Sequence, residues 1–297
     1  MNTNNNNSAD ELNLLRIIKS LCVTKIRSPM STEQTKAWLN QFDKGPEKIL
    51  ALLILRFLIY RTSDQLKSSL KQAFKSAATN FIPSAYIAEN IEWRDVLTGK
   101  VAGLSFCYGP AKQDDTRPGK SGEVISRLLK FCIPLDESQL VYPDKLLELK
   151  ENQRYLLIDD GIYTGTQLTT FIREGGGFMV GNGQAGIVVG LAHEEAIQNL
   201  QKAFPSIPIF YGEKITPKEC FVEMSAEWVS NGLWQFSDTS PLDQYNAVVE
   251  KKGNFENPAP LGFGNLGCMI AYEHGIPDNS LQLLWGKSDT WNPLFER

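Results

Sequence analysis

The sequence is poor in the residues that build metal centres and disulfide frameworks. Its 297 residues include only two histidines, and its five cysteines are scattered with no Cys-x-x-Cys pair. We therefore expect neither a zinc site nor a disulfide framework. The cysteines are Cys22, Cys107, Cys132, Cys220 and Cys268.

A charge excess of one sign and a long apolar run are also missing. The 30 Lys and Arg against 34 Asp and Glu leave a net charge of −4, which excludes a broadly basic nucleic-acid binder. The most apolar stretch, Ile49–Tyr60, is shorter than the roughly 20 residues that span a bilayer, and it contains Arg56. The N-terminus has no basic segment followed by an apolar one, as a secretory signal would. We expect a cytoplasmic globular protein without a membrane segment.

The N-terminal part is predicted to be helical. Residues 1–10 begin with an asparagine run, have little to bury and should form a disordered tail. From there to residue 94, apolar side chains recur at helical spacing. Ser31 and Gln34 are placed as a capping box, and Pro46 suits a first helical turn. The sequence therefore predicts a helical N-terminal region over 11–94.

Beyond residue 94, short apolar runs alternate with helical patterns. Strands are predicted at Val101–Tyr108, Tyr155–Ile158, Ala185–Leu191 and Ile207–Tyr211. Helices are predicted at Gly122–Phe131, Gln167–Glu174 and His193–Phe204. A succession of strand, helix and strand indicates a parallel sheet covered on both faces. We predict an α/β core over 95–215 and an irregular C-terminal cap over 216–297.

The strongest local signal is an apolar strand that ends in two adjacent carboxylates, followed by a turn of small residues that opens a helix. The N–H groups and the dipole at such a helix start favour phosphate. The carboxylates could accept hydrogen bonds from sugar hydroxyls or coordinate Mg²⁺. The alternative interpretation is a strand–turn–helix junction without a ligand. We name these residues the ribose-phosphate loop: Asp159, Asp160, Gly161, Thr164, Gly165 and Thr166.

A second candidate anion site follows the first predicted strand, where a Gly-rich turn enters a helix. This basic loop contains Lys112, Arg117, Lys120 and Ser121. Cations beside the N–H groups of a helix start favour an anion. The Gly-Lys-Ser sequence is not a Walker A loop, because Asp114 occupies the position of its first glycine. The alternative interpretation is a solvated basic loop.

The C-terminal region contains a turn with Glu273 and His274, a Pro-Asp-Asn run, and a tail with Trp285, Trp291 and Phe295. A single histidine is more often structural, and such aromatic residues more often pack in a core than stack on a ligand. Glu273 and His274 are nevertheless candidate general bases.

The segment from Tyr155 to Thr166 resembles the signature with which type I phosphoribosyltransferases bind 5-phosphoribosyl 1-pyrophosphate (PRPP). The resemblance implies that Asp159 and Asp160 contact the ribose 2′ and 3′ hydroxyls and that the Thr164-Gly165-Thr166 turn holds the 5′-phosphate. In that family the loop after an earlier strand binds pyrophosphate. The basic loop has the matching position, with Lys120 and Ser121 as its preferred members.

Together with the C-terminal His, Pro-Asp-Asn and Trp run, the chain resembles the PRTase-CE proteins of bacterial conflict systems over about residues 95–297. This implies an effector of anti-phage defence, as found beside some retrons. The implied ligand is PRPP, or a related ribose phosphate or nucleotide, with Mg²⁺ at Asp159 and Asp160 and chemistry at the ribose C1′. The implied partners are a reverse transcriptase with its nucleic acid or a winged-helix protein, and an oligomer is compatible with the resemblance.

Two departures from the transferases leave catalysis open. The connection from Cys132 to Gln153 is short where those enzymes carry a mobile catalytic hairpin, and no base-binding hood is recognisable. One alternative is a sensor that binds PRPP or a nucleotide without turning it over. Another is an assembly subunit whose N-terminal helices dock a partner.

Overall fold

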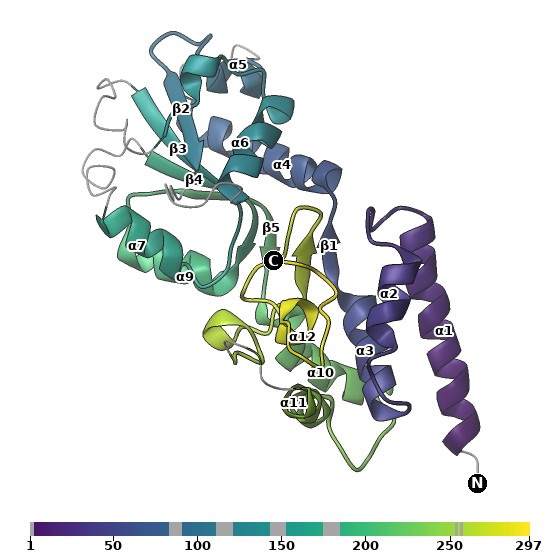
Figure 1. Cartoon of the computed structure of the whole chain (residues 1–297). Helices are drawn as coiled ribbons and strands as arrows, with labels where there is room; N and C mark the ends of the chain where they lie inside the picture. Colours follow the sequence, from purple (N-terminus) through teal and green to yellow (C-terminus); the bar gives the residue numbers. More distant parts are fainter. Residues whose placement is uncertain are drawn as a thin grey trace. The chain divides into compact units, whose positions relative to one another are not determined.

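The computed structural model describes residues 3–82, 91–110, 121–142, 153–174, 185–252, 255 and 258–297. The chain forms two compact units, shown in Figure 1. We call Ser63–Ile215 the sheet unit, and Met1–Thr62 together with Thr216–Arg297 the terminal unit. Within the described ranges, no helix combines the length and the apolar character needed to cross a bilayer.

The sheet unit contains a four-stranded sheet in the order β2-β3-β4-β5, and every neighbouring pair is parallel. The strands are β2 (Ser105–Pro110), β3 (Gln153–Ile162), β4 (Ala185–His193) and β5 (Ile209–Ile215). The helices are α4 (Ser63–Phe81), α5 (Trp93–Leu97), α6 (Ser121–Cys132), η2 (Glu137–Gln139), α7 (Thr166–Glu174) and α9 (Glu194–Ala203). The predicted α/β class with a parallel sheet is confirmed, and each predicted strand and helix of this region overlaps an observed one.

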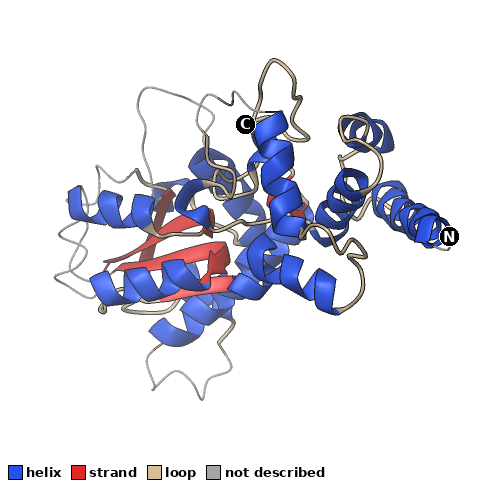
Figure 2. Ribbon diagram, turned by 90° about the horizontal axis from the view of Figure 1, so that it is seen from below, coloured by secondary structure: helices blue, strands red, loops and turns tan. Residues whose placement is uncertain are grey.

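Helices cover both faces of this sheet, as Figure 2 shows. On one face, Leu157 and Val189 belong to a buried cluster with Leu168 of α7 and Leu200 of α9. The opposite face is covered by α4 and α6. All nine residues of β4 are buried, as expected for an inner strand of a parallel sheet with both faces covered.

Glycines in the sheet allow α4 to approach it closely. A Cβ atom at Gly212 of β5 would lie 2.2 Å from the backbone oxygen of Ser69 on α4. A Cβ atom at Gly190 of β4 would lie 2.4 Å from a methyl carbon of Leu66 and 2.8 Å from the backbone oxygen of Asp160. A side chain at Gly212 would push the backbone of α4 away from the sheet, and one at Gly190 would displace Leu66 and meet the backbone of β3. The helix α4 is therefore an integral layer of the sheet unit.

The contacts of α4 explain why the two units differ from the predicted division of the chain. The expected boundary between residues 94 and 95 lies inside the sheet unit, which already begins at Ser63. The amphipathic pattern of α4 shows that one of its faces is buried, but it does not show which element buries it.

The terminal unit is built from both ends of the chain. Its first segment contains α1 (Thr3–Val23), α2 (Thr32–Leu39), α3 (Pro46–Phe57) and β1 (Ile59–Arg61). Its second segment contains η4 (Pro217–Glu219), α10 (Phe221–Ser230), α11 (Pro241–Lys251), η5 (Phe263–Asn265), β6 (Ile270–Tyr272) and α12 (Gln282–Trp285). Strands β1 and β6 pair in parallel and join the two segments, with Ile59 opposite Ile270.

Aromatic side chains and one arginine fix the core of the terminal unit. The indole nitrogens of Trp38 and Trp291 both donate to the carbonyl of Leu283, at 3.0 and 3.1 Å. The buried Arg27 donates to the carbonyls of Leu55, Arg56 and Leu58. It thereby satisfies acceptors that the C-terminus of α3 leaves without helical partners. Burial lowers the pKa of Arg27 to about 10.

Three local features differ from the sequence expectations. The helix α1 begins at Thr3, where a disordered tail was expected, and helix growth from turns anchored by buried Leu14 and Ile18 accounts for it. Helices α10 and α11 lie in the C-terminal segment, where no helix was expected. Ser31 caps α2 by accepting from the Gln34 nitrogen at 3.0 Å, but the Gln34 side chain donates to the carbonyl of Leu294 instead of completing the box.

We predict that Gly212→Ala destabilises the protein more than Gly186→Ala. At Gly212 the new Cβ would meet the backbone of Ser69, which cannot move by itself, whereas at Gly186 it would meet the end of the Leu156 side chain at 2.9 Å. We expect Gly212→Ala to lower the free energy of unfolding by about 3 kcal/mol and Gly186→Ala by about 1 kcal/mol. Urea unfolding of both variants measures this, and equal losses would contradict the close approach of α4.

Candidate functional site

The predicted ribose-phosphate loop starts at the carboxyl end of β3. Tyr155 to Ile158 are buried, and the strand then becomes half-buried at Asp159 and Asp160. An Asp159 carboxylate oxygen accepts from the backbone nitrogen of Asp160 at 2.9 Å, and an Asp160 oxygen accepts from that of Gly161 at 2.8 Å. Both carboxylates are therefore held against the backbone at the edge where open parallel sheets bind ligands.

The turn after β3 is a positive-φ turn that opens a helix. Gly165 has a φ of +75°, which few residues other than glycine adopt, and α7 begins directly after it at Thr166. The Thr164 hydroxyl accepts from the Thr166 nitrogen at 3.3 Å. The carbonyl of Thr164 accepts from the side chain of Asn199 on α9 at 3.0 Å, which ties the turn to that helix.

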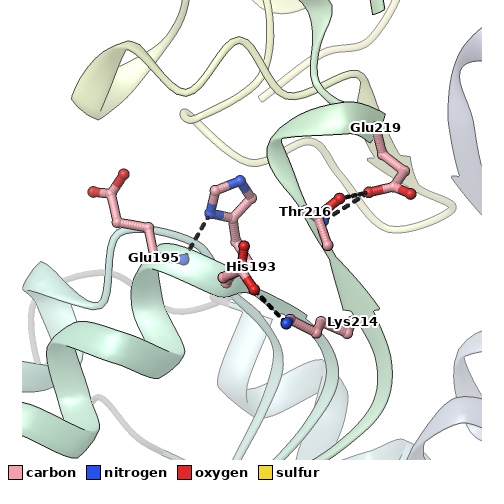
Figure 3. A network of polar contacts seen from close by, with 6 residues as sticks. His193, Glu195, Lys214, Thr216 and Glu219 are labelled. Atoms are coloured by element: carbon pink, nitrogen blue, oxygen red, sulfur yellow. Dashed lines mark hydrogen bonds and ion pairs between the residues drawn. The ribbon is translucent and has the colours of Figure 1, made fainter. Parts of the chain in front are cut away.

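The end of β4 supplies a histidine at the same edge of the sheet. Strand register places Ile162, the last residue of β3, opposite Ala192, so His193 ends β4 at the level where the chain leaves β3. Only 2% of the His193 surface is exposed. Its Nδ1 atom accepts from the Glu195 nitrogen at 3.2 Å and caps α9, as Figure 3 shows. An accepting Nδ1 means that the neutral ring carries its proton on Nε2.

The end of β5 adds a cation to this edge. Register places Lys214 opposite Ala192, and Lys214 forms an ion pair with Glu194 at the start of α9. The hydrogen bond to Glu194 raises the pKa of Lys214. The edge thus carries carboxylates near the end of β3, an imidazole at the last residue of β4 and an ion pair at β5.

Figure 3 also draws Thr216 and Glu219, which belong to the terminal unit. The Glu219 carboxylate accepts from the Thr216 nitrogen at 2.7 Å and from its hydroxyl at 2.6 Å. These contacts close the short turn η4 and serve the local fold.

The charged members of the basic loop, Lys112, Arg117 and Lys120, lie outside the described residues. Ser121 is the first residue of α6. Strand β2 ends at Pro110, which is opposite Ile158 in the neighbouring strand. The chain therefore leaves β2 next to the position where β3 reaches Asp159, and the assignment of the basic loop remains a prediction.

Glu273 and His274 lie in the terminal unit, in a turn directly after β6. The Glu273 nitrogen donates to the carbonyl of Arg61 at 3.0 Å, and the His274 ring stacks on Tyr272 with centroids 5.1 Å apart. Their assignment as general bases remains a prediction.

The rest of the C-terminal signature holds the terminal unit together. Asn279 donates from its side chain to the carbonyl of Phe263 at 2.9 Å, and its own carbonyl accepts from the Cys268 nitrogen. Trp291 is fully buried, and Phe295 stacks on Tyr60. These contacts support the interpretation of the aromatic tail as packing.

The described residues restrict how a metal could bind. Within the described ranges, no group of three or more His, Cys, Asp or Glu side chains is placed to hold an ion. Two neighbouring carboxylates are hard oxygen donors that suit Mg²⁺, which commonly uses one or two carboxylates and takes further oxygens from phosphates and water. Asp159 and Asp160 are oxygen donors of the kind Mg²⁺ uses, and an ion bound there would need further oxygens from a ligand or water.

Sequence reasoning did not select His193 and Lys214 as site residues. The signal in the sequence was their place near the ends of predicted strands, because ligands of open α/β sheets bind outside the carboxyl ends of the strands. A polar residue directly after the long apolar run of β4 met that criterion. The pairing of Lys214 with Glu194 required the register of β5.

The parallel sheet with this loop at its edge is that of a phosphoribosyltransferase-like protein. The sequence model of the PRTase-CE family matches residues 35–297, which is most of the chain, and the chain therefore belongs to this family. The match begins well before residue 95, where the noted resemblance began, and so includes α3 and α4. None of the curated proteins compared with the chain matches it.

We predict that the cap formed by His193 stabilises α9. His193→Ala removes the acceptor of the Glu195 N–H and should lower the free energy of unfolding by about 1 kcal/mol. His193→Asn supplies a different acceptor at the same place and should recover most of that loss. Urea unfolding of both variants tests this, and an equal loss in both would show that the ring acts through its packing.

Proposed function

We propose that the protein binds PRPP, or a related ribose phosphate or nucleotide, at the carboxyl edge of the sheet and acts at the ribose C1′. The observation that carries this proposal is the junction of β3 and α7. Two carboxylates that could accept hydrogen bonds from a ribose diol lie near the end of β3, a few residues before a positive-φ turn at Gly165 that opens a helix. Membership of the PRTase-CE family supports the same ligand class.

Mg²⁺ is the proposed cofactor, held by Asp159, Asp160 and the phosphate oxygens of the ligand. When bound, it would neutralise part of the ligand's negative charge. The cations of the basic loop, above all Lys120, would stabilise the pyrophosphate as the bond between C1′ and its oxygen breaks. The bonding electron pair leaves with pyrophosphate, and an acceptor with a lone pair forms the new bond to C1′ while a base takes up its proton.

We further propose a role as a cytoplasmic effector of anti-phage defence, which rests on the family resemblance. The proposed partners are a reverse transcriptase with its nucleic acid or a winged-helix protein. Exposed apolar side chains before residue 35, where the family match starts, support docking of such a protein. They are Leu12, Leu15, Ile17, Val23 and Ile26.

A sensor that binds without turnover is the second candidate, and the described part of the connection after α6 favours it. Type I phosphoribosyltransferases carry a mobile catalytic hairpin between the helix and the strand that correspond to α6 and β3. Here Gln139 of η2 donates to the carbonyls of Leu97 and Phe106, and the Val141 nitrogen donates to that of Tyr108 at 2.9 Å. This stretch is fixed against β2.

We predict that Asp159→Ala combined with Asp160→Ala abolishes most of the affinity for PRPP. Loss of two charged acceptors of the ribose hydroxyls should weaken binding about a hundredfold or more. Titration calorimetry with PRPP and Mg²⁺ measures the change. The matched control is Glu92→Ala combined with Asp95→Ala, which removes the same charge from surface ion pairs with Arg94 and Lys100. Unchanged affinity in the first variant would eliminate this site.

We predict that the wild-type protein releases pyrophosphate from PRPP when a suitable acceptor is present. Lys120→Ala should slow the release about a hundredfold, because it removes a charge that stabilises the leaving group. Lys202→Ala, at an exposed position of α9, is the control. Binding without any pyrophosphate release, across bases, nucleosides and water as acceptors, would favour the sensor.

A further inference from the structure

Two cysteines that are far apart in the sequence meet in the terminal unit. The sulfur atoms of Cys220 and Cys268 lie 3.8 Å apart, and both side chains are buried. The sequence predicted no disulfide framework, because the cysteines are odd in number and scattered. The fold nevertheless brings these two cysteines into contact.

The backbone around the two thiols is held in place by hydrogen bonds. The nitrogen of Phe221, the residue after Cys220, donates to the carbonyl of Gly267, the residue before Cys268, at 2.7 Å. The Cys268 nitrogen also donates to the carbonyl of Asn279 at 3.1 Å, and the Cys268 carbonyl accepts from the Leu281 nitrogen at 2.9 Å. These hydrogen bonds hold the two backbone segments together beside the sulfurs. Rotation of the cysteine side chains would then shorten the sulfur–sulfur distance to the roughly 2 Å of a disulfide.

The surroundings of the pair differ from those of the other three cysteines. Cys220 is the N-cap residue of α10, and its sulfur has the sulfur of Cys268 as its neighbour. Burial raises the pKa of Cys107, and it raises that of Cys132 to about 11. Cys22 has the hydroxyl of Thr35 as its neighbour, at 3.7 Å. Cys220 and Cys268 are thus positioned for an oxidation that joins two thiols.

We propose that Cys220 and Cys268 are a redox modification site, at which a peroxide converts the two thiols into an intramolecular disulfide. The Cys220 sulfur attacks one peroxide oxygen, the O–O bond breaks, and a sulfenic acid and water form. The Cys268 sulfur then attacks the sulfenic sulfur, forms the S–S bond and displaces the hydroxyl as a second water. Two S–H bonds are lost, and the two electrons reduce the peroxide.

The disulfide would restrain the part of the terminal unit between α10 and β6. It would close the segment that contains α10 and α11 onto the strand leading to Glu273 and His274. Such a cross-link stabilises mainly by limiting the unfolded chain, and the effect increases with the length of the closed loop. The proposal does not depend on the function proposed above.

The test uses the full chain, treated with hydrogen peroxide after complete reduction and then denatured and alkylated. We expect the number of alkylated thiols to fall from five to three, and peptide mapping to find one cross-link between the peptides that contain Cys220 and Cys268. The oxidised protein should unfold about 5 °C or more above the reduced protein. Because the mapping uses wild-type protein, it does not require a variant to fold.

Matched variants test the pairing. Cys268→Ser should lose both the cross-link and the thermal shift, whereas Cys132→Ser should keep both. Five alkylated thiols after treatment, a cross-link to another cysteine, or oxidation of Cys220 to a sulfinic acid without a cross-link would each overturn the proposal.

Discussion

The close approach of α4 to the parallel sheet is the constraint on which the rest of the sheet unit depends. A parallel sheet needs both faces covered, and α4 covers one of them at a distance that only glycine permits at position 212. The same Gly190 lies against the backbone oxygen of Asp160. The packing that buries the sheet therefore also positions the end of β3, where the candidate site begins.

Strand register then determines which side chains share the edge of the sheet. The backbone hydrogen bonds of neighbouring parallel strands align Asp159 with Val189, and Ala192 with Lys214. The carboxylates, His193 and the pair of Lys214 with Glu194 consequently lie toward the carboxyl ends of three adjacent strands. The sequence separates these groups by dozens of residues, and only the parallel arrangement brings their strand ends together.

The terminal unit shows the same dependence on distant segments. Strand β1 pairs with β6 from the other end of the chain, and the indoles of Trp38 and Trp291 share the carbonyl of Leu283. The indole of Trp38 thus finds its acceptor in the other segment of the unit. This explains why sequence patterns described the first segment as helices and the last as irregular. The C-terminal residues acquire their order from contacts that no local window contains, as Asn279 does from Phe263.

The sequence by itself determined the α/β class, the approximate strands and helices of the sheet unit, and the loop from Asp159 to Thr166. These follow from local properties: apolar periodicity, β-branched runs, and a Gly-containing turn that opens a helix. Tertiary structure alone decided that α4 belongs to the sheet, that His193 caps α9 beside the loop, and that Cys220 meets Cys268. The physical reason is that these features are contacts between segments far apart in the chain. Periodicity shows that a face is buried, but register and packing select its partner.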